Sequence, residues 1–529
     1  MTSLAVTRRI IGAAGLLAAA HTASAQAAPS PVVKRTAYED LQMFGQVLNQ
    51  IRINHPDSVD AHELFMAAIE GMIHAADPHS YVIPAVRLEP GKEQALREKK
   101  LVRVPVNFAF VGGAPIVVSV SAGTAARQLD ILPGDELIAA EGAPVSSGSA
   151  EELEITLAGK KGSTVTLTFE RRRADGSLTR LERAIKRESV DEATAVPVAT
   201  MLDSTTGYTR VTTFDGEKVA DDLHSALERL EKSGMKRLIL DLRDNGGGSV
   251  AEAAQVAGEF LPRGAVVYSA SGRKAEITDT GRVKRSFWRS ERRYPIVVMV
   301  NSGTASASEL VAGALQDHDR ALIVGRPTFG KSLLMRGFPM SDGSVLVLVI
   351  GQVRTPCGRV VQREYRTISR RDYYRLARAE RDTAGRPSCK TDSGRTVYGG
   401  GGVYPDILIA ESPSMPRWFA RAEEQQLFLS WSGSYVDGKG ATLGALDTFA
   451  AAGPLPAAVL SDFRAYAAKQ GVDVPADADD LLQRELRSGI AYAKWGTEGA
   501  YRVEVKADAA VQKAMAGFSE AGKLLGTSH

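Results

Sequence analysis

Residues 295–309, PIVVMVNSGTASASE, change abruptly from strand character to helix character. The first six, from Pro295 to Val300, are apolar and rich in β-branched side chains, which is typical of a strand buried on both faces. The next nine are mostly small or polar, and an apolar stretch from Leu310 to Leu315 follows. This order predicts a buried strand that leads through a short loop into a helix.

The serine at the start of the predicted helix has two interpretations. Ser306 and Glu309 fit a capping box, in which the two side chains satisfy free amides of the first helical turn. The same position suits a nucleophile, because free amides and the helix dipole at a helix start favour negative charge. A serine nucleophile needs a base, and no histidine lies in an obvious strand-end loop near this segment.

Lys331 is the candidate base. It lies 25 residues after the serine, behind an apolar strand at 321–324 and a turn at 327–330. A lysine can act as a base only when burial lowers its pKa, so that a neutral amine is present. The apolar neighbours Phe329 and Leu333 suit such burial, whereas a lone lysine is otherwise expected on the surface.

The same lysine belongs to a second motif. Residues 325–332, GRPTFGKS, match the phosphate-binding P-loop pattern letter for letter. A P-loop requires a helix directly after its Lys-Ser pair, so that the helix N-terminus faces the phosphates. Here Asp342-Gly343 separates two β-like runs, which predicts a hairpin instead. The context therefore disfavours nucleotide binding.

The rest of the chain divides into regions of different pattern. Residues 196–410 alternate strands and helices, which predicts an α/β core. Residues 100–190 contain short β-rich segments separated by glycines, which predicts a small β domain. Residues 37–99 form a helical N-terminal region, and residues 415–529 are an alanine- and leucine-rich helical tail. The predicted fold class is therefore multidomain, with α/β and α+β parts.

The N-terminus has the pattern of a signal peptide over residues 1–25. Arg8-Arg9 precede an apolar run from Ile10 to Ala20, and the small-residue site Ala23-Ser24-Ala25 follows. The run is about half the length that spans a bilayer, which disfavours a retained anchor. Residues 7–9 also offer a looser match to a twin-arginine signal. We expect an exported protein, periplasmic or secreted after cleavage.

Composition narrows the function classes further. A net charge of +3 over 529 residues, without long Lys/Arg runs, argues against nucleic-acid binding. In an exported protein, Cys357 and Cys389 either form one disulfide or remain as two buried thiols. Neither lies in a CxxC or Cys/His cluster, so no metal site is expected.

Seven segments, in order, resemble the C-terminal processing (tail-specific) protease family, which pairs a PDZ domain with a Ser/Lys serine-protease core. The resemblance extends from Tyr38 to Ile409. In the β domain, the turn Pro133-Gly134-Asp135 before an apolar strand is similar to PDZ domains, although Ala125 and Asp130 depart from the usual residues. The seven segments are Tyr38–Leu41, Asp77–Tyr81, Asp241–Gly248, Gly303–Leu310, Thr328–Lys331, Thr355–Arg359 and Gly401–Asp406.

The resemblance implies a role for each site residue. Ser306 would be the nucleophile and Lys331 the general base, while the amides of Gly247 and Ala307 would form the oxyanion hole. No cofactor is implied. Met335 stands where many members carry a glutamine that orients the lysine, and a thioether is only a weak acceptor.

One aspartate also matches the family pattern. Asp317 lies where members often carry an aspartate, and we assign it a structural role.

The implied function is serine endopeptidase activity on extended polypeptides through an acyl-enzyme, with C-terminal tails of substrates bound at the PDZ-like domain. No nucleic-acid partner and no stable membrane anchor are expected, and the sequence leaves homo-oligomer formation open. An alternative from another class is a catalytically weak, PDZ-bearing peptide-binding scaffold, which Met335 and the imperfect PDZ motif motivate.

Overall fold

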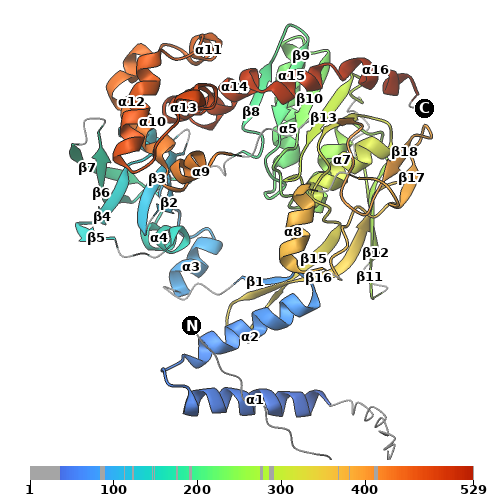
Figure 1. Cartoon of the computed structure of the whole chain (residues 1–529), viewed down its shortest axis with the longest axis horizontal. Helices are drawn as coiled ribbons and strands as arrows, with labels where there is room; N and C mark the ends of the chain where they lie inside the picture. The colour runs from blue at the N-terminus through green and yellow to red at the C-terminus, as the bar shows by residue number, and fades with distance from the viewer. Residues whose placement is uncertain are drawn as a thin grey trace, which may run out of the picture. The chain divides into compact units, whose positions relative to one another are not determined.

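The computed structural model describes much of the chain (Figure 1). The signal peptide prediction for residues 1–25 lies outside the described residues. The chain forms two units, residues 1–71 and residues 72–529. The described residues are 36–527 without 84–89, 112, 122–123, 146, 148, 174–176, 190–193, 275–277, 285–290, 367, 380–381 and 410–414.

The first unit contains helix α1 (Ala37–Asn54) and most of α2 (Ala61–Ala76), as the sequence periodicity predicts. Thr36 and Glu39 form a capping box at the start of α1, with the Thr36 amide 2.7 Å from the glutamate carboxylate. The rings of Phe44 and Phe65 lie 5.7 Å apart and join the two helices. No residue of α1 is buried, so this helix contributes little core of its own.

The second unit begins with β1 (Tyr81–Ile83) and α3 (Pro90–Arg97), and continues into the predicted β domain. Its sheet has the order β2-β3-β4-β6-β7, with β5 beside β4. Leu167 and Phe169 alternate inward along β6 and are fully buried, which gives this sheet one apolar face. The elements are β2 (Val106–Val111), β3 (Ala114–Val120), η1 (Ala125–Gln128), β4 (Glu136–Ala140), β5 (Ala143–Pro144), α4 (Ala150–Leu157), β6 (Thr164–Arg172) and β7 (Leu178–Lys186).

The central sheet of the α/β region has the order β19-β14-β13-β10-β9-β8. Neighbouring strands are parallel, except that β8 and β9 are antiparallel. The strands and their helices are β8 (Val198–Met201), β9 (Thr206–Arg210), α5 (Val219–Lys232), β10 (Arg237–Asp241), α6 (Val250–Gly258), β13 (Ile296–Val300), α7 (Ala307–Asp317), β14 (Leu322–Gly325) and β19 (Ile407–Leu408).

This sheet is covered on both faces, because all five residues of strand β13 are buried. Val298 belongs to the core shared with α5, α6 and α7, whereas Val297 belongs to the core shared with the C-terminal helices. Helices α15 (Ala509–Met515) and α16 (Phe518–Thr527), in red in Figure 1, lie against β13 and β14. The apolar run identified in the sequence is therefore the middle layer of a three-layer α/β fold.

A second sheet has the order β1-β16-β11-β12, with β15 also paired to β16. The antiparallel hairpin of β15 and β16 directly follows Lys331-Ser332, so the prediction of a hairpin is confirmed and the P-loop context is absent there. The remaining elements up to residue 398 are β11 (Val266–Gly272), β12 (Thr278–Arg282), β15 (Leu333–Pro339), β16 (Val345–Arg354), α8 (Arg370–Ala379), β17 (Ser388–Lys390) and β18 (Thr396–Tyr398).

The tail is helical, as predicted. Trp431 and Phe463 are fully buried in its own core, while α14 to α16 supply Val505, Val511 and Phe518 to the central sheet. Across the described residues, none of the helices combines the length and the apolar character needed to cross a bilayer. The elements are α9 (Arg417–Glu424), α10 (Leu427–Lys439), η2 (Gly440–Thr442), α11 (Leu446–Ala451), α12 (Ala457–Lys469), η3 (Ala476–Ala478), α13 (Asp479–Trp495), α14 (Thr497–Ala507), α15 (Ala509–Met515) and α16 (Phe518–Thr527).

Candidate active site

Ser306 lies at the sharp turn between β13 and α7, in a backbone conformation that serine rarely adopts. Its φ is 57° and its ψ is −119°, so the residue sits at positive φ directly before the helix. Such a conformation costs a non-glycine residue on the order of 1–3 kcal/mol and is found mainly at functional sites. A strained serine between a strand and a helix is also the geometry that exposes the nucleophile in some hydrolases.

The glycine loop after β10 lies directly against this serine. Gly247 has φ +102°, and a Cβ placed on it would lie 2.7 Å from the Ser306 Cβ and 2.9 Å from the Ala307 nitrogen. The Asn245 carbonyl accepts hydrogen bonds of 2.9 Å from the Ala305 amide and from the Ser308 hydroxyl. The loop and the nucleophile segment are thus fixed to each other, and position 247 leaves no room for a side chain.

The two predicted oxyanion donors have different surroundings. Ala307 is the first residue of α7 and is fully buried beside Gly247. The Gly247 N–H donates to the Asn245 side-chain oxygen at 2.9 Å, while its carbonyl accepts from the Phe214 amide at 2.8 Å. Gly247 therefore lies beside Ser306, but its amide is bonded within its own loop.

Glu309 joins the nucleophile segment to the base segment. Its fully buried carboxylate accepts hydrogen bonds of 2.8 Å from the backbone amides of Ser306, Gly330 and Lys331. The Thr328 hydroxyl donates to the same carboxylate at 2.5 Å. Sequence reasoning assigned Glu309 a capping role only. Its bond to Ser306 is present, and the three bonds to residues 328–331 had no signal in the sequence.

Burial changes the proton affinity of both ionisable groups at this junction. It raises the pKa of Glu309 to about 7, even though four donors hold the carboxylate. Burial also lowers the pKa of Lys331, partly offset by the carboxylates of Glu309 and Asp77. A lowered lysine pKa is the direction that base catalysis requires.

The Lys331 side chain is less constrained than its backbone amide. Among the described residues, no hydrogen bond joins the Ser306 hydroxyl to this amine, and such bonds often form only when substrate is present. Met335 is half-buried on β15 at an irregularity in its pairing with β16, opposite Val349. The Val349 amide donates to the Ser80 hydroxyl at 3.0 Å, which attaches the Asp77–Ser80 turn to the same hairpin.

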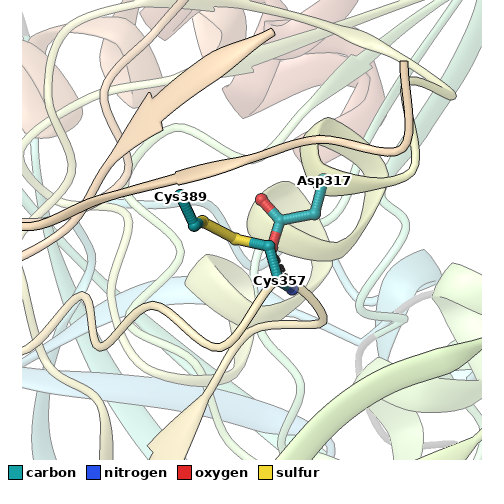
Figure 2. A group of neighbouring side chains, drawn as sticks. All are labelled: Asp317, Cys357 and Cys389. Carbon is teal, nitrogen blue, oxygen red and sulfur yellow. Dashed lines mark hydrogen bonds between the residues drawn. A yellow bond between two sulfur atoms is a disulfide. The ribbon is translucent and has the colours of Figure 1, made fainter. Parts of the chain in front are cut away.

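Asp317 lies apart from this junction, in a structural cluster (Figure 2). Its carboxylate is 2.7 Å from the Arg359 guanidinium, both side chains are 1% exposed, and it accepts a 3.1 Å hydrogen bond from the Cys357 amide. Cys357 and Cys389 form a disulfide, which decides between the two alternatives left open by the sequence. The three side chains have metal-ligand atoms within 4.8 Å of one another, but the sulfurs are bonded to each other rather than present as thiolates.

Comparison with known proteins agrees with this architecture. Residues 205–368 match peptidase family S41, and residues 94–182 match the PDZ domain. These matches define a serine peptidase of family S41 that carries a PDZ domain.

Relatives narrow the class further. The chain is 30% identical over 333 residues to the carboxy-terminal-processing protease of Bartonella bacilliformis, covering 62% of this chain and 74% of the relative. The carboxy-terminal processing protease CtpB of Bacillus subtilis is 25% identical over 374 residues, covering 69% of this chain and 75% of the relative. The chain therefore belongs to the carboxy-terminal-processing protease family.

A chloroplast relative matches a shorter part of the chain, and a solved structure matches at lower identity. The carboxyl-terminal-processing peptidase 2 of Arabidopsis thaliana is 32% identical over 284 residues, covering 51% of this chain and 53% of the relative. The solved photosystem II D1 C-terminal processing protease is 23% identical with a TM-score of 0.34, covering 71% of this chain and 87% of the other.

Proposed function

We propose that this chain is a serine endopeptidase of the C-terminal processing type, with Ser306 as nucleophile and Lys331 as general base. The observation that carries the proposal is the buried Glu309 carboxylate, which binds the backbone amides of both residues at 2.8 Å. The strained conformation of Ser306 and the lowered pKa of Lys331 support the same assignment.

The chemistry follows from these roles. The Ser306 hydroxyl attacks a substrate carbonyl carbon while the neutral Lys331 amine takes the hydroxyl proton. The tetrahedral oxyanion accepts hydrogen bonds from the Ala307 and Gly247 amides, for which the Gly247 amide exchanges its Asn245 partner for the substrate. The peptide bond breaks as Lys331 gives its proton to the leaving amine. A water deprotonated by Lys331 then attacks the acyl ester, and Lys331 returns that proton to the leaving Ser306 oxygen, which regenerates the hydroxyl and the neutral amine.

The substrate and the location of the protein belong to the same proposal. We infer polypeptide substrates whose C-terminal tails bind the PDZ domain, in keeping with the names of the relatives. Residues 1–25 act as a cleaved signal peptide, and the protein is periplasmic or secreted. The Cys357–Cys389 disulfide supports export, because disulfides persist in oxidising compartments.

The test is proteolysis by the purified mature chain. Wild type should degrade an unfolded protein, whereas Ser306→Ala and Lys331→Ala should lose at least about a thousandfold of that activity. Thermal melts of all three proteins check that each variant is folded. Equal activity of wild type and Ser306→Ala would refute the nucleophile assignment.

A peptide-binding scaffold is the second candidate, favoured by the bonded Gly247 amide and by Met335. Peptide binding without cleavage in wild type, unchanged in Ser306→Ala, would establish this candidate instead.

A further inference from the structure

Helix α8 supplies a buried tyrosine to the segment that carries Lys331. Tyr373 is 0% exposed, and it lies beyond residues 205–368, the part of the chain that matches peptidase family S41. We propose that Tyr373, acting together with Gln362, is a positioning residue for the Lys331 base. This inference rests on the proposed function of Lys331.

A continuous chain of hydrogen bonds encloses Lys331 from both sides. The Ser332 amide donates to the Gln362 side-chain oxygen at 2.8 Å, and the Gln362 side-chain nitrogen donates to the Tyr373 hydroxyl at 3.2 Å. The Tyr373 hydroxyl donates in turn to the Gly330 carbonyl at 3.2 Å. The peptide units before and after Lys331 are therefore both bound to one side-chain pair.

Aromatic contacts hold the tyrosine itself in place. Its ring meets Phe329 edge-on at a centroid distance of 5.6 Å, and His79 edge-on at 5.0 Å. Edge-to-face pairs of this kind stabilise a structure beyond the area that they bury. Tyr373 thus joins α8, the Asp77–Ser80 turn and the Lys331 segment.

This arrangement supplies what Met335 cannot. A methionine thioether offers only a weak acceptor to an amine, so it cannot fix the direction of the lysine side chain by strong hydrogen bonding. Holding the Gly330 carbonyl and the Ser332 amide fixes the backbone at Lys331 and hence the direction of its Cα–Cβ bond. The segment containing α8 thereby becomes part of the machinery that orients the base.

The decisive variant is Tyr373→Phe, which removes the hydroxyl and keeps the ring. We expect kcat to fall about fivefold to tenfold at neutral pH, with KM nearly unchanged, because the variant loses the two 3.2 Å hydrogen bonds of the buried hydroxyl. A looser segment admits water, so the pKa of Lys331 should rise toward its ordinary value. The increase of kcat with pH should therefore move to higher pH, and the deficit should shrink in alkaline buffer.

Other charged groups face this region and need controls. They are Glu309 on α7, Asp77 and His79 in the turn before β1, and Arg363, whose amide also donates to the Gly330 carbonyl at 2.9 Å. Repeating the comparison in a His79→Phe background prevents imidazole titration from producing the shift. Tyr294→Phe is the matched control, because it removes a 3.1 Å hydrogen bond from a tyrosine to Glu231 outside this cluster.

Gln362→Met breaks the same chain at its other end and should reproduce the shift in the pH profile. Two results for Tyr373→Phe would overturn the inference. One is an unchanged kcat, and the other is a kcat that falls by the same factor at every pH, as it would if part of the protein were inactive. The Ser306→Ala and Lys331→Ala variants separate the two proposals. If both abolish cleavage while Tyr373→Phe behaves as wild type, only the role of Tyr373 fails, whereas activity without Lys331 refutes the base assignment itself.

Discussion

The nucleophile and the base lie on segments of very different construction. Every residue of α7, which begins directly after Ser306, is buried between the central sheet and its neighbours. The β15 strand that follows Lys331 has one buried residue in seven, and the Lys331 side chain is itself partly exposed. Ser306 is thus held by the buried core. The segment of Lys331 instead depends on a few long-range hydrogen bonds, which link Glu309 to the Lys331 amide, and Gln362 and Tyr373 to the residues on either side of it.

The largest expected effect comes from filling the space beside the rigid nucleophile. In Gly247→Ala, the added Cβ would lie 2.7 Å from the Ser306 Cβ. The alanine would also have to adopt a positive φ, which is unfavourable for any residue other than glycine. We expect kcat/KM for a peptide substrate to fall about a thousandfold, because the loop must move away from the oxyanion position.

Gly264→Ala is the matched control for this variant. Gly264 has φ +84° but open space around it, so the alanine brings backbone strain without a clash. Comparable losses of peptidase activity in the two variants would show that strain, rather than the contact with Ser306, is responsible.

Glu309→Gln tests the connection between the two segments. Four donors bind the carboxylate, and an amide group can accept at only one of its two ends, so one or more amides would lose their partner. We expect kcat to fall about tenfold to a hundredfold with little change in KM. Glu252→Gln, at a buried carboxylate that accepts the Ala220 amide on α5, should retain wild-type kcat.

Glu309→Gln should also change how the stability of the protein depends on pH. Burial raises the pKa of Glu309 from 4.5 to about 7, so the folded state binds more protons than the unfolded state between these values. The free energy of unfolding should therefore decrease as pH rises from about 4.5 through about 7. Urea unfolding measures this free energy at each pH. Between about pH 4.5 and 7 it should change less with pH in Glu309→Gln than in wild type. Equal pH dependence in the two proteins would contradict the raised pKa of Glu309.

The difference between the two segments also decided what the sequence could predict. The strand, the turn and the helix start around Ser306 are local, so the apolar run and the capping pattern were sufficient to place them. Asp342-Gly343 likewise predicted the hairpin that excludes a P-loop. The positive φ of Ser306 and the bond from the Gly247 amide to Asn245 depend on the folded loop, and no spacing encodes them.

Long-range partners were beyond prediction for the same reason. Glu309 has a recognisable local role, but its bonds to residues 328–331 require the chain to return after β14. The pairing of Cys357 with Cys389 spans 32 residues and could not be chosen over two free thiols. Tyr373 belongs to none of the sequence motifs, and only the structure brings it to the Lys331 segment.

The disulfide provides a test of the less rigid region. Replacing both Cys357 and Cys389 by serine should lower the free energy of unfolding by about 3 kcal/mol, because the unfolded chain loses a covalent constraint. Since the bond holds residues 355–359 beside Asp317 rather than Lys331, kcat of the folded variant should fall only severalfold. An unchanged urea midpoint would show that the core alone holds this loop, and wild type treated with reductant should reproduce the loss if the bond matters.

A substitution at Met335 makes the base segment more similar to the pattern that the family resemblance implies, and we expect its effect to be small. Met335→Gln places an amide at the half-buried position on β15 where the family resemblance implies an orienting glutamine. If Tyr373 and Gln362 already hold the backbone on both sides of Lys331, the added amide should raise kcat only about twofold. In the Tyr373→Phe background the same substitution should raise kcat more, because the lysine there lacks one of its constraints. A double-mutant cycle measures this difference directly, and strictly additive effects would mean that residues 335 and 373 act on the base independently.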